Sequence, residues 1–232
     1  MEILISIICG ASNFAVPEVP TGDRDILVVS KGHAALAQYA VMNEAGLIGN
    51  EFIKQYQKNG SDYPEELMKD EKLRIECSTG SLGIGLPYAV GRAIFAKRRR
   101  RNQKIFCLVG DGECDEGSVW EAIMLAAQQK LNNMVLVVDL NGLQADGNTE
   151  EIITWNNMKN QMESFGWTAV QVDGHDFKEL QKAFQTVTDK PLAILAKTIK
   201  GKGISFMEGD YSWHDRVLNK KLLEQAKAEI GL

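Results

Sequence analysis

The chain has 232 residues, of which 44% are hydrophobic and 25% are charged, and its formal net charge is -5. This length suffices for one large α/β domain with a substantial core, and the composition is ordinary for a soluble globular protein. The negative charge gives no indication of nucleic-acid binding, and no apolar run is long enough to cross a bilayer. We therefore expect neither a nucleic-acid nor a membrane partner.

The four cysteines, at positions 9, 77, 107 and 114, show no CxxC spacing and no Cys/His cluster. This pattern is typical of reduced thiols in a cytoplasmic protein. The first ten residues, MEILISIICG, lack a basic leader and a cleavage site, so they predict a structural helix instead of a signal peptide. The basic run 97–101 precedes an apolar segment and predicts a solvated helix end, where cations are favourable, in preference to a polyanion site.

Apolar periodicity predicts helices and strands that alternate along the chain. The expected helices span 1–10, 34–46, 50–58, 83–100, 118–131, 155–164, 176–188 and 219–229. The expected strands span 26–30, 105–110, 134–140, 166–174 and 192–198.

Two of these strands, IFCLVG at 105–110 and MVLVVDL at 134–140, are short, apolar and rich in β-branched residues. Such strands suit a sheet that is buried on both faces. The helix between them predicts a parallel pair with a right-handed crossover. The whole alternation therefore predicts an α/β fold in one domain, 1–232, with a doubly wound, mainly parallel sheet and helices on both faces.

Polar residues follow both of these strands directly, at the edge of the sheet where such folds bind ligands. Gly110-Asp111-Gly112 permits a tight turn and a close approach to an anion. Asp111 offers a carboxylate oxygen, Asn141 an amide oxygen, and the Gly142-Leu143 segment a backbone carbonyl. Mixed oxygen ligands of this kind suit Mg²⁺ or Ca²⁺, whose charge would in turn attract phosphate.

A lone GDG or Asn-Gly is a common turn signal and a weak indication of function. Their occurrence at two successive strand ends, with an amphipathic helix between them, is far more specific. The segment resembles the thiamine diphosphate motif, and its wording, GDGECDEGSVWEA followed by DLNGLQADG, is similar to transketolases, in particular the N-terminal subunit of split, two-chain members of that family. The resemblance implies metal ligation by Asp111, Asn141 and the Leu143 carbonyl, with Gly110 and Gly112 beside the diphosphate.

The resemblance extends over nearly the whole chain. SKGHA implies that His33 faces the cofactor or substrate, and STGSLG implies that Gly80 and Leu82 approach the aminopyrimidine or the diphosphate. KGKGISFMEGDYSWHD places His214 where a family histidine reaches the diphosphate. Glu116 matches a family acid near the subunit interface that helps to relay protons. Each has a plainer reading: His33 as a turn cap, His214 as a packing residue, and Glu116 as a helix N-terminal acid favoured by the dipole.

Two departures from the family pattern bear on these roles. Transketolases carry an SGHPG motif ahead of the segment with which this sequence starts, and that motif is absent, through truncation or as a natural shortening. Tyr63 stands where many relatives have a histidine, and a phenol is not cationic near neutral pH. Either departure is compatible with a different sugar or with weakened activity. His175 precedes an expected helix and predicts a strand–helix turn, not a site residue.

The resemblance also implies an incomplete site, because this chain has only the diphosphate-binding half. A separate pyrimidine-binding transketolase C-terminal subunit would complete it, in an α2β2 assembly that transfers a two-carbon ketol unit from a ketose, free or phosphorylated, to an aldose. Alone, the chain should be inactive. The alternatives are a non-catalytic or scaffold subunit of the same fold and another thiamine diphosphate enzyme with a different substrate.

Overall fold

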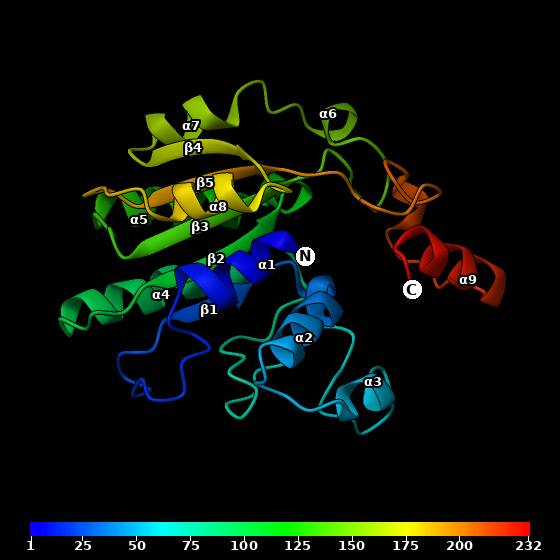
Figure 1. The fold of residues 1–232 in the computed structure, drawn as a ribbon. Helices are drawn as coiled ribbons and strands as arrows, with labels where there is room; N and C mark the ends of the chain where they lie inside the picture. Colours follow the sequence, from blue (N-terminus) through cyan, green and yellow to red (C-terminus); the bar gives the residue numbers. More distant parts are fainter.

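A computed structural model describes residues 1–232, and a five-stranded parallel sheet lies at its centre (Figure 1). In chain order the strands are β1 (Ile26–Val29), β2 (Ile105–Gly110), β3 (Met134–Leu140), β4 (Thr168–Asp173) and β5 (Leu192–Lys197). Their spatial order is β1-β2-β3-β5-β4, and every adjacent pair is parallel. The predicted fold class is confirmed.

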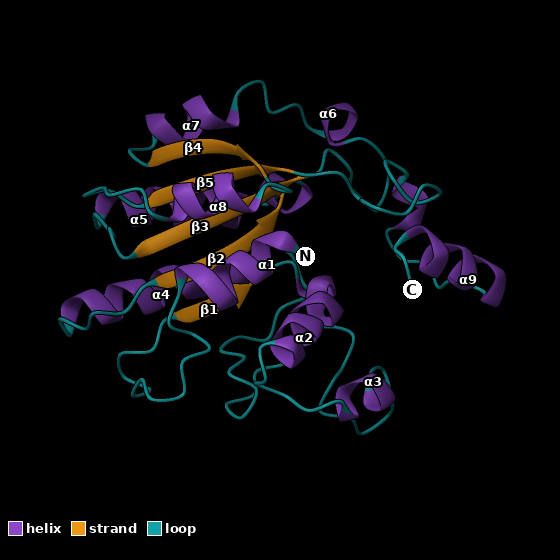
Figure 2. Cartoon of the chain, in the orientation of Figure 1, coloured by secondary structure: helices purple, strands orange, loops and turns teal.

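Helices cover both faces of the sheet (Figure 2). They are α1 (Glu2–Ser6), α2 (Ala35–Glu44), α3 (Glu51–Gln55), α4 (Gly85–Arg98), α5 (Gly117–Gln128), α6 (Thr149–Ile152), α7 (Met158–Ser164), α8 (Phe177–Phe184) and α9 (Lys220–Glu229). A π-helical turn, Ile7–Ala11, extends α1, as the N-terminal helix prediction requires. No helix is long and apolar enough to cross a membrane.

The sheet has a separate hydrophobic core on each face. Helices α1, α2 and α8 pack on one face, and α4, α5 and α7 pack on the other. Within β2 the side chains alternate between the cores, with Phe106 and Leu108 on the first and Cys107 and Val109 on the second. The chain steps in one direction from β1 to β2 and β3 and steps back from β4 to β5, so right-handed crossovers place α5 and α8 on opposite faces.

Several helices are shorter than predicted because local groups fix their ends. Helix α4 begins at Gly85 instead of 83, since Gly83 has a φ of +76° in the preceding turn. Helix α7 begins at Met158, where the side chain of Asn157 caps the helix by accepting from the Asn160 N–H. Helix α3 stops at Gln55 because Tyr56 leaves the helical region with a ψ of 130°.

Two smaller predictions are also confirmed. The basic run lies at the end of α4, where the Lys97 ammonium donates to the carbonyls of Gln129 and Lys130. His175 lies in the turn between β4 and α8, where its Nδ1 is 2.9 Å from Oε1 of Glu2 and its Nε2 accepts from the Ile199 N–H. Both of its ring nitrogens are therefore used to join segments of the fold.

A substitution at Trp167 tests how much the core on the α4, α5 and α7 face contributes to stability. Trp167 is fully buried, and its indole N–H donates a hydrogen bond of 2.9 Å to the Ile123 carbonyl. We expect Trp167→Ala to lower the free energy of unfolding by about 3–5 kcal/mol, as large-to-small changes in cores do. Urea unfolding followed by circular dichroism measures this. Val187→Ala, at a 99% exposed side chain, is the control and should stay within about 0.5 kcal/mol. A Trp167→Ala effect below about 1 kcal/mol would contradict the assignment.

Candidate functional site

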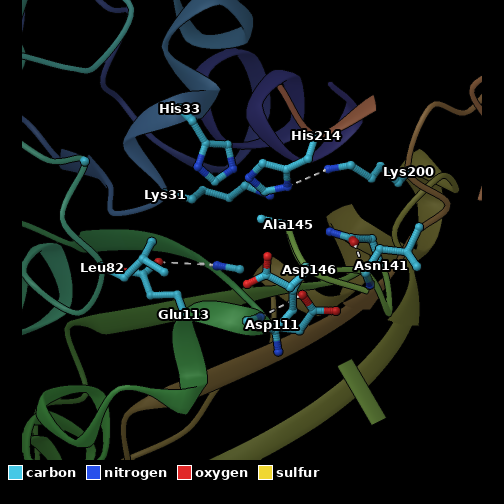
Figure 3. A pocket seen from close by; sticks show the side chains of 15 residues that line it. Lys31, His33, Leu82, Asp111, Glu113, Asn141, Ala145, Asp146, Lys200 and His214 are labelled. Atoms are coloured by element: carbon cyan, nitrogen blue, oxygen red, sulfur yellow. Dashed lines mark hydrogen bonds between the residues drawn. The ribbon is translucent and has the colours of Figure 1, made fainter. Parts of the chain in front are cut away.

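A cavity of about 330 Å³ opens beyond the carboxyl ends of the strands (Figure 3). Its walls come from the segments that follow β1, β2, β3 and β5, from the glycine turn before α4, and from the loop that carries His214. It is lined by Lys31, His33, Gly80, Leu82, Gly110, Asp111, Gly112, Glu113, Asn141, Leu143, Gln144, Ala145, Asp146, Lys200 and His214. Nine of the ten residues that the sequence nominates are therefore brought together here.

The exception is Glu116, which does not line the cavity. It precedes the first residue of α5, and its side chain packs close to Gly83 in the glycine turn. The family role expected for this acid lies at a subunit interface, so its assignment stays a prediction.

Tyr63 also lies away from the cavity, although its position in the sequence suggested a replacement for a site histidine. Its side chain is buried, and its ring packs edge-on against Tyr39 at a centroid distance of 5.4 Å and in a tilted arrangement against Phe52 at 6.2 Å. Tyr63 is thus a core residue in this structure, and its hydroxyl is not available to a ligand in the cavity.

The oxygen ligands expected from GDG and Asn lie on one side of the cavity. Asp111 is buried, and its two carboxylate oxygens accept the backbone N–H groups of Gly112 at 2.8 Å and Gly142 at 2.6 Å. The Asn141 amide oxygen accepts the Leu143 N–H at 3.0 Å. Leu143 forms a narrow antiparallel bridge with Asn148, and its carbonyl accepts no hydrogen bond from the protein.

These groups fit a hard metal ion. No group of three His, Cys, Asp or Glu side chains is placed to hold a metal. A cation here would depend instead on one carboxylate, one amide oxygen and one free carbonyl, which are the oxygen ligands that Mg²⁺ and Ca²⁺ accept. The backbone N–H groups bound to Asp111 fix the direction of its carboxylate before any metal arrives.

Basic side chains form the opposite side of the cavity, where His33, His214, Lys31 and Lys200 converge (Figure 3). The rings of His33 and His214 have centroids 4.9 Å apart, and the Lys200 ammonium lies 3.3 Å from Nδ1 of His214. Loss of hydration, together with Lys31 and His214, lowers the pKa of His33 to about 4. The pKa values of His214 and Lys200 are lowered by burial and by neighbouring cations.

Lys31 is held by an ion pair that the sequence analysis did not anticipate. Its ammonium lies 2.7 Å from Asp139 in β3, and the Thr198 hydroxyl donates to the other oxygen of that carboxylate. Burial opposes both charges, yet the attraction between them outweighs it, so the pKa of Lys31 is raised and that of Asp139 is lowered. The sequence did indicate that Asp139 needs a buried partner, because it is the one charged residue in the apolar run MVLVVDL.

Glu113 is a second residue that sequence reasoning missed. One carboxylate oxygen accepts the Ser30 hydroxyl and the Gly83 N–H at 2.9 Å, and the other accepts the Gly110 N–H at 3.4 Å. The Ser30 oxygen in turn accepts the Gly85 N–H at 3.0 Å, at the start of α4. Burial raises the pKa of Glu113, and these donors act in the opposite direction. The sequence did contain an indication of this role, because the Glu113 carboxylate directly follows the GDG turn.

Asp115 orders the loop that follows Asn141. Its carboxylate accepts the Gln144 side-chain amide at 2.7 Å and the Trp155 indole N–H at 3.0 Å. The Trp155 ring also packs on Trp120 of α5, with centroids 4.9 Å apart. The loop that carries the expected metal ligands is therefore fixed at both of its ends.

Comparisons with known proteins agree with this geometry. Residues 13–232 match the family model described as "Transketolase, thiamine diphosphate binding domain". The chain belongs to the transketolase family. It is 38% identical to one subunit of the apulose-4-phosphate transketolase of Actinobacillus succinogenes, over 99% of this chain and 84% of that protein. It is 36% identical to one subunit of a 6-deoxy-6-sulfo-D-fructose transketolase of a Clostridium species, over 90% of this chain and 77% of that protein.

Larger transketolases match as well. Human transketolase is 40% identical over 92% of this chain, which spans only 34% of the human protein. The crystal structure of the Campylobacter jejuni transketolase superposes with a TM-score of 0.84 and 33% identity, over 93% of this chain and 36% of that one. The predicted relationship to the N-terminal subunit of split transketolases, with a thiamine diphosphate-binding domain, is thus confirmed.

Removal of the Glu113 carboxylate tests how this transketolase-family site is held in shape. In Glu113→Ala, one hydroxyl and two peptide N–H groups lose a buried acceptor, and each such loss costs about 1–3 kcal/mol. We expect the free energy of unfolding to fall by at least about 3 kcal/mol in urea titrations. Glu113→Gln keeps one acceptor oxygen and should lie between the wild type and Glu113→Ala. Glu121→Ala, on the exposed side of α5, is the control. Equal effects of Glu113→Ala and the control would refute this role.

The lowered pKa of His33 predicts how the stability of the chain depends on pH. With a pKa of about 4 in the folded chain and an ordinary value of 6.5, His33 binds its proton more readily when unfolded. Its contribution to stability is therefore complete above pH 6.5 and declines as the pH falls towards 4. An NMR titration of the three imidazoles should show His33 neutral down to about pH 5. Lys200→Gln should raise the pKa of His33 and His214, whereas Lys202→Gln should not; unchanged midpoints in Lys200→Gln would rule out this electrostatic coupling.

Proposed function

We propose that this chain is the diphosphate-binding subunit of a two-chain transketolase, which transfers a two-carbon ketol unit from a ketose to an aldose. One observation carries the proposal: oxygen ligands and basic side chains face each other across a single cavity at the carboxyl edge of the sheet. Such a cavity suits a metal-bound diphosphate, since the metal neutralises the carboxylate side and the phosphates meet Lys200 and the N–H groups of the two histidines. The relatives that are themselves named as single subunits of transketolases support the two-chain form.

Within this proposal, Asp111, Asn141 and the Leu143 carbonyl ligate the metal, which is Mg²⁺, with Ca²⁺ as a substitute. Gly110 and Gly112 are assigned to the diphosphate, and a β-carbon on Gly112 would lie 2.8 Å from the Gln144 side chain, so the GDG turn packs closely on the loop after Asn141. When bound, the cofactor supplies the carbanion chemistry by which the two-carbon unit is carried.

The two cavity histidines suit hydrogen bonding to a bound ligand as neutral imidazoles. Burial and neighbouring cations lower the pKa values of His33 and His214, which favours the neutral form, and a neutral imidazole has one nitrogen that donates and one that accepts a hydrogen bond. His33 is assigned to the reacting carbonyl or diphosphate, and His214 to the diphosphate. Gly80 and Leu82 are assigned to the aminopyrimidine or the diphosphate, and Glu116 to the proton relay at the subunit interface.

A separate pyrimidine-binding subunit completes the site in this proposal, in an α2β2 assembly with sugars or sugar phosphates as substrates. Leu82 and Ile84 support an interface beside the cavity, because they are 38% and 50% exposed in the glycine turn. Residues 1–232 then act as one thiamine diphosphate-binding domain. The four free thiols suit a cytoplasmic location.

Asp111→Ala tests the metal assignment. In the complex with the copurified partner subunit, titration calorimetry with thiamine diphosphate and Mg²⁺ should show saturable binding to the wild type. The variant should bind at least a hundredfold more weakly, because the cation loses its only carboxylate ligand. Asp189→Ala, an exposed carboxylate outside the cavity, is the matched control. Wild-type affinity in Asp111→Ala would show that the ligand assignment is wrong.

The same complex separates the enzyme from a scaffold subunit. Coupled assays with a panel of ketose donors and aldose acceptors should show transfer only when both subunits, cofactor and Mg²⁺ are present. Cofactor binding without transfer to any acceptor would favour the non-catalytic alternative. Absence of cofactor binding in the presence of the partner would refute the enzyme-subunit proposal.

A further inference from the structure

A second cavity, of about 390 Å³, lies at the opposite edge of the sheet from the transketolase site. Its walls come from the loop before β1, from the segment 69–76 and from the third turn of α4. Ile26, the first residue of β1, contributes to it, whereas the transketolase site lies beyond the last residues of the strands. The two cavities share no lining residue.

Cations outnumber carboxylates among the residues that line this second cavity, although the chain as a whole is negative. The cations are Arg24, Lys69, Arg74 and Arg92, and the carboxylates are Asp25, Glu71 and Glu76. Two of the carboxylates already have partners. Asp25 accepts the backbone N–H groups of Asn13 at 3.0 Å and Lys104 at 2.7 Å, and Glu76 forms an ion pair of 3.0 Å with Arg92.

Arg24 and Arg74 have no carboxylate partner within ion-pair distance. Each uses its guanidinium to reach one backbone carbonyl: Arg24 donates to Val19 at 2.8 Å, and Arg74 donates to Phe14, over whose ring it also lies. A guanidinium has five N–H donors, so most of their capacity is unused by the protein. The Nε atoms of Arg24 and Arg92 are buried and have no hydrogen-bond partner at all.

The two unpaired guanidiniums are also close enough to disfavour each other. Burial, and then the charge of Arg24, lowers the pKa of Arg74. Buried donors without acceptors and adjacent like charges both cost free energy. A single bound anion would relieve both costs, because it accepts several N–H groups and neutralises the repulsion.

We propose that the cavity between Arg24, Arg74 and Arg92 binds a phosphate-bearing small molecule, at a site separate from the transketolase centre. A tetrahedral oxyanion has oxygens that point in several directions, so it can accept from several guanidinium groups at once, and arginine binds phosphate through paired N–H groups. The cavity is larger than a phosphate ion, and the aromatic ring of Phe14 lies in its wall beside Arg74, which leaves room for an organic body. The proposal does not depend on the function of the transketolase site.

NMR of arginine side chains tests this site directly. The Nε–Hε signals of the full chain are assigned with Arg24→Lys, Arg74→Lys and Arg92→Lys variants and followed as inorganic phosphate is added at constant ionic strength. We expect saturable shifts of the Arg24, Arg74 and Arg92 signals in the wild type. Arg74→Gln should weaken the binding measured at Arg24 at least tenfold. Arg99→Gln, which removes an arginine stacked on Phe95 outside the cavity, should leave it unchanged.

Phosphate can also enter the transketolase cavity, and Lys200→Gln separates the two events. That variant should keep the arginine shifts while it weakens any shift of the His214 signals. Arginine signals that do not move in the wild type, or that move equally in Arg74→Gln, would overturn the proposal and leave the arginines as ties for the loop before β1. The wild-type titration decides the question even if Arg74→Gln fails to fold.

Discussion

The carboxylate of Glu113 is the contact on which the shape of the transketolase site depends. It joins three segments that are far apart in the sequence: Ser30 at the end of β1, Gly83 in the turn before α4, and Gly110 at the end of β2. Each donor would otherwise be buried without an acceptor, so the three segments can approach only because Glu113 lies between them. The glycine turn, which brings Gly80 and Leu82 to the cavity, is thereby fixed against the GDG turn that carries Asp111.

Separation of charge within the cavity follows from that framework. The carboxylates of Asp111 and Asp146 lie on the side of Asn141, whereas His33 and His214 lie with Lys200 across the cavity (Figure 3). Lys31 would add a further free cation, but Asp139 neutralises it at 2.7 Å. A metal and a diphosphate together would complement the two sides, whereas either alone would leave one side unbalanced. This arrangement is the reason why the proposal places a metal-bridged anion here instead of a free one.

Most of the fold was predictable, because four of its five strands are apolar runs and helices such as α8 and α9 have clear amphipathic periods. The positions of Asp111 and Asn141 were predictable too, since parallel strands bring their carboxyl ends to one edge. Contacts between distant segments were not. The Lys31–Asp139 pair joins residues 108 positions apart, and no local pattern indicates such a pairing. Tyr63 was assigned towards the site from its neighbours in sequence, but its aromatic ring packs into the core instead. The observed helix starts differ from the predicted ones where a side chain accepts a backbone N–H of the first turn. The Ser30 hydroxyl does so for Gly85 in α4, and the Asn157 side chain does so for Asn160 in α7.

The composition of the cavity wall supports the proposal that a second subunit completes the site. Only three of its fifteen lining residues are hydrophobic, which suits a metal and phosphates but not an aromatic ring system. Ligand sites for organic rings are lined mainly by apolar and aromatic side chains. Leu82 and Ile84, in the glycine turn beside the cavity, are partly exposed, and the proposed second subunit would cover them. A second subunit that supplied an apolar wall would bury these side chains and enclose the ring in the same step, so assembly and cofactor binding would be thermodynamically linked. On this argument, the affinity of the isolated chain for the cofactor is limited to what the diphosphate and metal contribute.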